Sequence, residues 1–266
     1  MAFLPVSSSA SVSPRRARAL ALTVRARPSS GRLPDVSERP GSTGEPRQRW
    51  RLVVARAPDA PEQPQRDVAE SWATAIGSAA LPVAWTEGAR PRQRIAFGAP
   101  LPVGMAANAE LIDVVLTERW PAWRLREALV ERLPLGWRLV DVHDVWLAGP
   151  PLAGRVAAAD YRAALIGDVP LDGLRAAAAD LLAASRVPRR RTKGPEDVEY
   201  DLRPLLVDVA IEAGPPPAVT TRTRFHAELG TGRPEEVVAA LAEHLAQPLA
   251  VSHIVRERLI LAEDLD

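Results

Sequence analysis

The sequence predicts an α+β protein built from two similar halves behind an N-terminal tail. From residue 50 onwards, short runs alternate apolar and polar residues as strands do, and stretches between them repeat apolar residues at helical spacing. The order strand, helix, strand, strand, helix, strand occurs twice, on either side of a Gly-Pro-Pro break at residues 149–151. We therefore expect a disordered tail over residues 1–46, a first half over residues 47–149 and a second half over residues 150–266.

The first half contains four predicted strands and two predicted helices. Alternation of apolar and polar residues indicates strands at residues 50–54, 94–97, 109–116 and 137–147. A four-residue spacing of large apolar side chains indicates helices at residues 66–80 and 121–133. Pro121 suits the first turn of the second helix, and Pro134 with Gly136 ends it. An extended segment at residues 81–85 precedes the second strand.

The second half repeats this order and adds a basic hairpin. Its strands are expected at residues 161–165, 205–211, 219–229 and 251–261, and its helices at residues 171–184 and 234–245. The hairpin covers residues 186–202 and turns at Lys193-Gly194-Pro195. The repeated order is that of the split unit in which two helices cover one face of an antiparallel sheet. It predicts tandem ferredoxin-like βαββαβ halves, an architecture that resembles that of the TruA-type pseudouridine synthases.

Composition excludes several kinds of site. The chain has no cysteine, so it cannot supply a disulfide, the thiolate ligands of an iron–sulfur cluster or a thiol nucleophile. Its four histidines show no HxxxH or HExxH spacing, and no phosphate loop or dinucleotide fingerprint occurs. We expect no cofactor, no metal and no catalytic residue, and a binding protein is favoured over an enzyme.

Charge and hydropathy limit the partners. The best candidate for a membrane span, residues 19–24, is short and bounded by Arg18 and Arg25, so a soluble cytoplasmic protein without a membrane partner is expected. The formal net charge is +1, so any affinity for nucleic acid must come from a local patch. RNA is a candidate ligand, and DNA is not expected.

The tail is rich in arginine, serine and proline. Six arginines precede the first acidic residue, Asp35; they are Arg15, Arg16, Arg18, Arg25, Arg27 and Arg32. This composition is typical of an unstructured bacterial tail or of sequence upstream of the true start codon, and an organellar transit peptide is the alternative. The sequence leaves open whether the tail belongs to the mature protein.

Two groups of basic residues are the candidate contacts for RNA or a partner protein. The first half contributes Arg90, Arg92 and Arg94, and the second half contributes Arg189, Arg190, Arg191, Lys193 and Arg203. Alternate residues of a strand share one face, and each guanidinium offers a planar fork of donors to a phosphate. The first group could equally be a solvated strand edge. The second could be neutralised by acids of its own hairpin, Glu196, Asp197, Glu199 and Asp201.

Several segments resemble the radical SAM-linked protein family, a domain of unknown function found fused to, or encoded beside, radical SAM proteins. The resemblance lies in residues 87–104, which end in Ala-Pro-Leu-Pro-Val-Gly, and in residues 109–116. It continues in Arg190-Arg-Thr-Lys-Gly194 and in Val198-Glu-Tyr-Asp-Leu-Arg-Pro204, and it covers residues 47–266. The resemblance implies a radical SAM protein as partner.

The chain departs from that family at two places. Ala89-Arg-Pro-Arg92 stands where members carry Asn-Pro-His-Pro, and Gln65-Arg-Asp-Val68 stands where they carry Ser-His-Leu-Asp. Both family histidines are therefore absent, and any site that they form is in doubt here.

The main functional hypothesis is an accessory protein that binds RNA or an RNA-modifying partner in a groove between the halves, lined by both arginine groups. The alternatives are a protein-interaction module for a radical SAM enzyme and a pseudouridine-synthase-like enzyme with Asp113 or Asp201 as nucleophile. The catalytic Gly-Arg-x-Asp-x-Gly stretch of the synthases is missing. Because Asp113 alternates with Ile112 and Val114, we interpret it as an outward-facing carboxylate.

Overall fold

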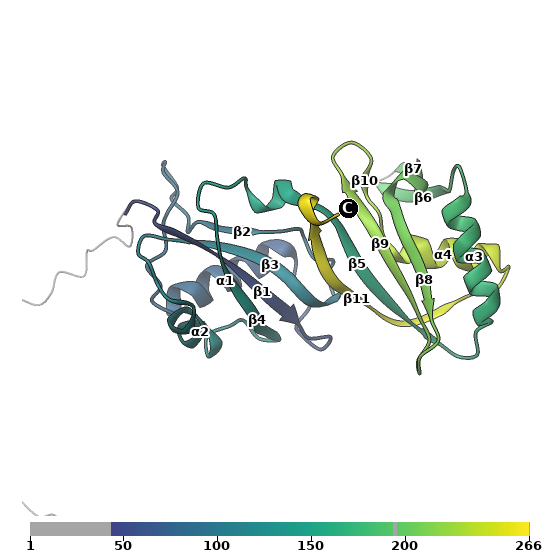
Figure 1. Cartoon of the computed structure of the whole chain (residues 1–266), viewed down its shortest axis with the longest axis horizontal. Helices are drawn as coiled ribbons and strands as arrows, with labels where there is room; N and C mark the ends of the chain where they lie inside the picture. The colour runs from purple at the N-terminus through teal and green to yellow at the C-terminus, as the bar shows by residue number, and fades with distance from the viewer. Residues whose placement is uncertain (1–43, 194–195, 266) are drawn as a thin grey trace, which may run out of the picture. The chain divides into compact units, whose positions relative to one another are not determined.

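A computed structural model describes residues 44–193 and 196–265, without the side chains of residues 191–197. Nearly all of the predicted tail therefore lies outside the described residues. Contacts between Cα atoms group Gly41–Asp266 into one compact unit. The fold is a mixed α+β arrangement around a mostly antiparallel sheet (Figure 1). Among the described residues, no helix is both long and apolar enough to cross a membrane.

The first half forms four strands and two helices in the predicted order. These are β1 (Gln48–Arg56), α1 (Gln65–Ser78), β2 (Ile95–Phe97), β3 (Ala106–Leu116), α2 (Ala122–Val130) and β4 (Trp137–Val145). The strands lie side by side as β4-β1-β3-β2, and each neighbouring pair is antiparallel.

The second half has the same arrangement with a hairpin inserted after its first helix. Its elements are β5 (Val156–Ile166), α3 (Leu171–Ala183), β6 (Pro188–Lys193), β7 (Glu196–Asp201), β8 (Leu206–Glu212), β9 (Ala218–His226), β10 (Gly230–Thr231), α4 (Pro234–His244) and β11 (Ala250–Leu261). Four strands lie side by side as β11-β5-β9-β8, again with antiparallel neighbours. The hairpin strands β6 and β7 pair only with each other among the described strands.

The two halves share one nine-stranded sheet because β11 also pairs with β3. This pairing is parallel and short, with Val255 opposite Ala106 and Arg256 opposite Ala107. On its other edge β11 pairs with β5 over nearly its full length. The junction therefore depends on one strand that contacts both halves.

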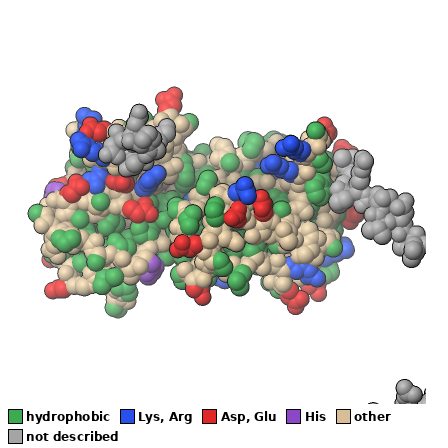
Figure 2. All heavy atoms as spheres, turned by 180° about the vertical axis from the view of Figure 1, so that it is seen from behind, with side chains coloured by type: hydrophobic (Ala, Val, Ile, Leu, Met, Phe, Trp, Pro, Cys, Tyr) green, Lys and Arg blue, Asp and Glu red, His purple; other side chains and the backbone are tan. Residues whose placement is uncertain are grey.

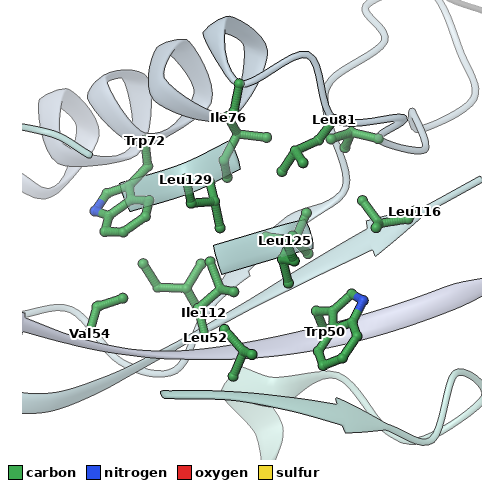
Figure 3. Packing of buried hydrophobic residues seen from close by; sticks show 14 of the residues in the cluster. Trp50, Leu52, Val54, Trp72, Ile76, Leu81, Ile112, Leu116, Leu125 and Leu129 are labelled. Atoms are coloured by element: carbon green, nitrogen blue, oxygen red, sulfur yellow. The ribbon is translucent and has the colours of Figure 1, made fainter. Parts of the chain in front are cut away.

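Separate clusters of buried apolar side chains stabilise the two halves. In the first, Trp50, Leu52 and Val54 of β1 face side chains of α1 and α2, including Trp72 and Leu125 (Figure 3). In the second, side chains of β5, β8 and β9 pack on α3 and α4. A third cluster lies at the junction, where Met105 from the first half meets Tyr161 and Leu259 from the second.

The predicted elements differ from the structure in a few places. Residues 81–85 make only isolated bridges, between Val83 and Leu116 and between Trp85 and Gln93, because the prolines and glycine nearby limit regular pairing. Helix α2 ends at Val130, and Leu133 lies beyond it, because Pro134 cannot continue the helix. The short strand β10 was not predicted, since two residues are too few to show alternation.

Candidate functional site

The first arginine group lies on a loop that its own hydrogen bonds hold closed. The backbone N–H of Thr86 donates to the carbonyl of Arg92 at 2.8 Å, and the N–H of Arg92 donates to Thr86 Oγ1 at 3.0 Å. At the base of the loop, Trp85 pairs with Gln93, and the N–H of Arg94 donates to the carbonyl of Ala84 at 2.8 Å. The loop therefore presents its side chains from a fixed backbone.

Arg90, Arg92 and Arg94 are all exposed on this loop. Arg94 lies in a surface depression with Glu45 and Glu87, but none of the three arginines forms an ion pair with a described residue. Exposed guanidinium groups that form no ion pair can bind phosphates without first breaking a protein contact. The first group is therefore available to an anionic ligand.

The second arginine group is mostly engaged within the protein. The Arg189 side chain is only 9% exposed and pairs with Glu236 and Glu243 of α4, at 3.1 and 2.7 Å. Arg190 is exposed but pairs with Glu199 on the opposite hairpin strand at 2.8 Å. Arg203 donates to the carbonyls of Leu182 at 2.7 Å and Ala184 at 3.1 Å, at the C-terminal end of α3. The side chains of Arg191 and Lys193 lie outside the described part of the chain.

The two arginine groups do not line one groove. The loop of residues 86–92 leads into β2, which pairs with β3, whereas the hairpin contacts α4 beyond the strands β11, β5 and β9. Figure 1 shows β2 and the hairpin far apart across the sheet. On the face in Figure 2, Lys and Arg side chains lie in small groups beside Asp and Glu side chains and form no continuous basic surface.

A hollow does lie between the halves, with other residues around it. It measures about 640 Å³ and is lined by the end of β1, the starts of β3 and β4, and β11. Leu52 and Val54 point to the face of the sheet that the helices cover, so Ala55 points to the opposite face. Arg138 is paired with Ala55 on the neighbouring strand and therefore lies on that opposite face too. Gly136 adopts a φ of 79° and approaches Ala60 so closely that no side chain would fit at this position of the lining.

Asp113 is buried, so its interpretation as an outward-facing carboxylate is wrong. It is 1% exposed and accepts hydrogen bonds from Arg49 Nε at 2.9 Å and Arg51 Nε at 2.8 Å. The linker between the halves covers this face of the sheet, and Arg49 also donates to the carbonyls of Gly149 and Pro150. Two guanidinium groups therefore surround the carboxylate, which leaves it no free lone pair facing solvent for nucleophilic attack.

Asp201 also has a structural contact. Its Oδ1 accepts the backbone N–H groups of Val187 at 2.8 Å and Arg203 at 3.0 Å, which closes the base of the hairpin. Neither carboxylate considered as a nucleophile is thus free of protein contacts. Within the described ranges, no group of three His, Cys, Asp or Glu side chains is arranged to hold a metal ion.

In the second half, charged side chains of β5, β9 and β11 form ion pairs with one another. Asp160 of β5 lies between Arg222 of β9 and Arg258 of β11, at 2.7 and 2.8 Å. Burial alone would raise the pKa of Asp160, but the hydrogen bonds and charges of the two arginines outweigh it and lower this pKa. This row of charges therefore stabilises the pairing of three strands, and both guanidinium groups are engaged by the same carboxylate.

Exposed apolar side chains concentrate along one edge of the first half. Five of the eight large apolar residues that are exposed in the described chain come from α2, β4 and the turns beside them, namely Trp123, Val130, Leu135, Val140 and Trp146. Trp123 is 66% exposed and Trp146 is 75% exposed. The strand β4 is also the last strand of the sheet on this side. Exposed tryptophans near an edge strand are typical of protein-binding surfaces.

Sequence reasoning missed Arg138, Asn108 and His253, which the fold brings to the hollow. They belong to β4, β3 and β11 and form no motif along the chain. The pairing of β11 with β3 brings His253 to the same hollow as Asn108.

Comparisons with known proteins place the chain in a family but give no activity. Two solved structures show low similarity, at 12% identity in both cases. A Cbf5-Nop10-Gar1 complex matches 78% of this chain and 48% of its own chain with a TM-score of 0.42, and an archaeal box H/ACA sRNP Nop10-Cbf5 complex matches 77% and 46% with a TM-score of 0.36. The chain thus spans about half the length of these matched chains. No curated protein matches. Residues 63–238 match the model of DUF2344, an uncharacterized protein conserved in bacteria, and the chain belongs to that family.

Proposed function

We propose that this protein is a non-catalytic cytoplasmic accessory protein that binds a structured RNA through Arg90, Arg92 and Arg94. The observation that carries the proposal is that these three side chains are exposed on a closed loop without an acidic partner among the described residues. The net charge of the chain is only +1, so a local group of this kind must supply the attraction to phosphates. The hairpin adds Arg190 only after its pair with Glu199 is broken.

Changing Arg90, Arg92 and Arg94 together to alanine is expected to weaken RNA binding strongly. Each lost phosphate contact removes about one released counterion, so the slope of log affinity against log salt should fall by roughly two to three. Binding of an unmodified tRNA transcript, measured by fluorescence anisotropy over a range of salt concentrations, checks this. The matched control changes the exposed Arg119, Arg132 and Arg175 to alanine and removes the same charge.

The control distinguishes a local contact from the overall charge. Equal weakening in both triple variants would show that only net charge matters and would contradict the assignment to this loop. An unchanged salt slope in the loop variant, or no binding by the native protein, would also contradict the proposal.

We further propose that each half is a ferredoxin-like unit, with boundaries at residues 47–149 and 150–266, in a tandem arrangement like that of the TruA-type synthases. The matching strand orders, β4-β1-β3-β2 and β11-β5-β9-β8, support this. A pseudouridine-synthase-like activity has no such support, because Asp113 and Asp201 are engaged in structural hydrogen bonds.

We also propose that a radical SAM protein docks on the apolar edge formed by Trp123, Val130, Leu135, Val140 and Trp146. The resemblance of residues 47–266 to the radical SAM-linked family suggests the partner, and the exposed tryptophans suggest the surface. Burying an exposed tryptophan at an interface commonly contributes about 2 kcal/mol or more. Docking there would leave the arginine loop on β2 open to RNA, because β2 and β4 lie on opposite sides of the first-half strands.

Changing Trp123 and Trp146 to serine is expected to abolish co-purification with a co-expressed radical SAM protein. Nuclease treatment before purification excludes an RNA bridge. A matched control changes Ile166 and Leu229, which are exposed apolar residues of the second half, to serine. Retention of the complex by the tryptophan variant, or no complex with the native chain, would contradict this docking surface.

A further inference from the structure

The hollow between the halves is lined by small apolar side chains and a few polar groups. The hollow has a volume of about 640 Å³ and lies over the neighbouring strands β11, β3, β1 and β4, at the start of β3. This volume lies in the usual range for small-ligand pockets. We propose that the hollow binds one unpaired nucleotide of an RNA strand. The inference rests on the proposed RNA binding and adds a second contact, separate from the arginine loop.

The floor of the hollow suits a planar base. It consists mainly of small apolar side chains, Ala55, Ala57, Pro58, Ala106 and Val255. Alanine and proline project little from the backbone, so they form a nearly flat apolar surface. Every base has an apolar face, whatever its hydrogen-bonding edge. A base that lies on this floor leaves water with one face and keeps its polar edge toward the rim.

The rim carries polar groups on opposite sides. Arg138 comes from β4 and His253 from β11, and three strand spacings separate these strands, about 14 Å. Arg138 is exposed and makes no ion pair within the described chain. His253 Nδ1 lies 3.0 Å from Ser252 Oγ, which leaves Nε2 to face a ligand. Arg138 can donate to one phosphate of an RNA strand, and His253 can contact the strand further along.

Asn108 lies between these two groups and can contact the base edge. Its Nδ2 donates to Glu257 Oε2 at 2.7 Å, so its Oδ1 is fixed in direction and can accept a hydrogen bond. Glu257 also adds a negative charge near the rim, which disfavours a ligand that is only anionic. A base with flanking phosphates satisfies the apolar floor, the amide, the guanidinium group and the imidazole together.

The test uses a fluorescein-labelled single-stranded uridine tetranucleotide and the full chain. Arg138→Ala is expected to weaken its binding about tenfold, and Ala57→Phe, which fills the hollow, should remove binding. The matched control Ala210→Phe places the same side chain at an exposed position on β8 and should leave binding unchanged. Thermal melting of each variant confirms that it is folded.

The outcomes separate this inference from the proposed function. The triple variant at Arg90, Arg92 and Arg94 should lose tRNA binding but keep tetranucleotide binding, which would support a distinct nucleotide site. Native affinity of the Ala57→Phe and Arg138→Ala variants for the tetranucleotide would overturn the site. Binding of tRNA without any binding of the tetranucleotide would overturn the site and leave the RNA-binding proposal standing.

Discussion

Replacing Arg256 by methionine is expected to destabilise the protein by about 3–5 kcal/mol, because Glu110 would remain buried without its partner. Arg256 is 1% exposed, and its Nε donates to Glu110 Oε1 at 2.6 Å. Its remaining donors reach the carbonyls of Pro100 at 3.0 Å and Ala99 at 3.3 Å. The pair joins β11 to β3, so the loss should appear as a lower midpoint in urea unfolding followed by circular dichroism.

The double variant Glu110→Leu with Arg256→Met supplies the control. It removes both charges, so it should recover part of the stability that the single variant loses. Recovery should be incomplete, because the carbonyls of Ala99 and Pro100 lose their donor. A single variant as stable as the native chain would show that the pair does not hold the two halves together.

Asp113→Ala is expected to lower the free energy of unfolding by about 3–5 kcal/mol, because it leaves two buried cations without a carboxylate. Arg49 and Arg51 are each 6% exposed, and Asp113 is their shared acidic partner. Thermal and urea unfolding measure the loss. Asp172→Ala is the matched control, because the Asp172 side chain is 99% exposed and its ion pair with Arg175 lies on the surface.

Further variants locate the origin of the Asp113 effect. Arg51→Met added to Asp113→Ala should restore part of the stability, because it removes one of the two unpaired cations. A loss below about 1 kcal/mol for Asp113→Ala would contradict a buried charge network, since that value is typical of surface pairs.

The sequence predicted most of the fold because local spacing reports which face of an element is buried. Trp72 and Ile76 on α1, and Leu125 and Leu129 on α2, repeat at helical spacing and all lie in the first core. The prediction failed where the deciding contact is distant. Asp113 looked like a solvent-facing residue because nothing in its own strand shows that the linker at Gly149 covers that face.

The candidate sites were harder to predict for the same reason. Arg189 and Arg203 made the hairpin look strongly basic in the sequence. In the structure, Arg189 pairs with Glu236 of α4, and Arg203 donates to the carbonyl of Ala184 at the end of α3. The sequence distance between Arg189 and Glu236 hides that pairing. Arg90 is exposed, as a local loop with alternating charges suggested, and its role in binding stays a prediction.

The position of β11 has a consequence for synthesis on the ribosome. The first half contains all four of its own strands before residue 150, so its core can form while the rest of the chain is still being translated. One edge of strand β5 stays unpaired until β11, about 90 residues further along the chain, has been translated. Until then the nascent chain exposes an unpaired strand edge, and a chaperone would be most needed during that interval.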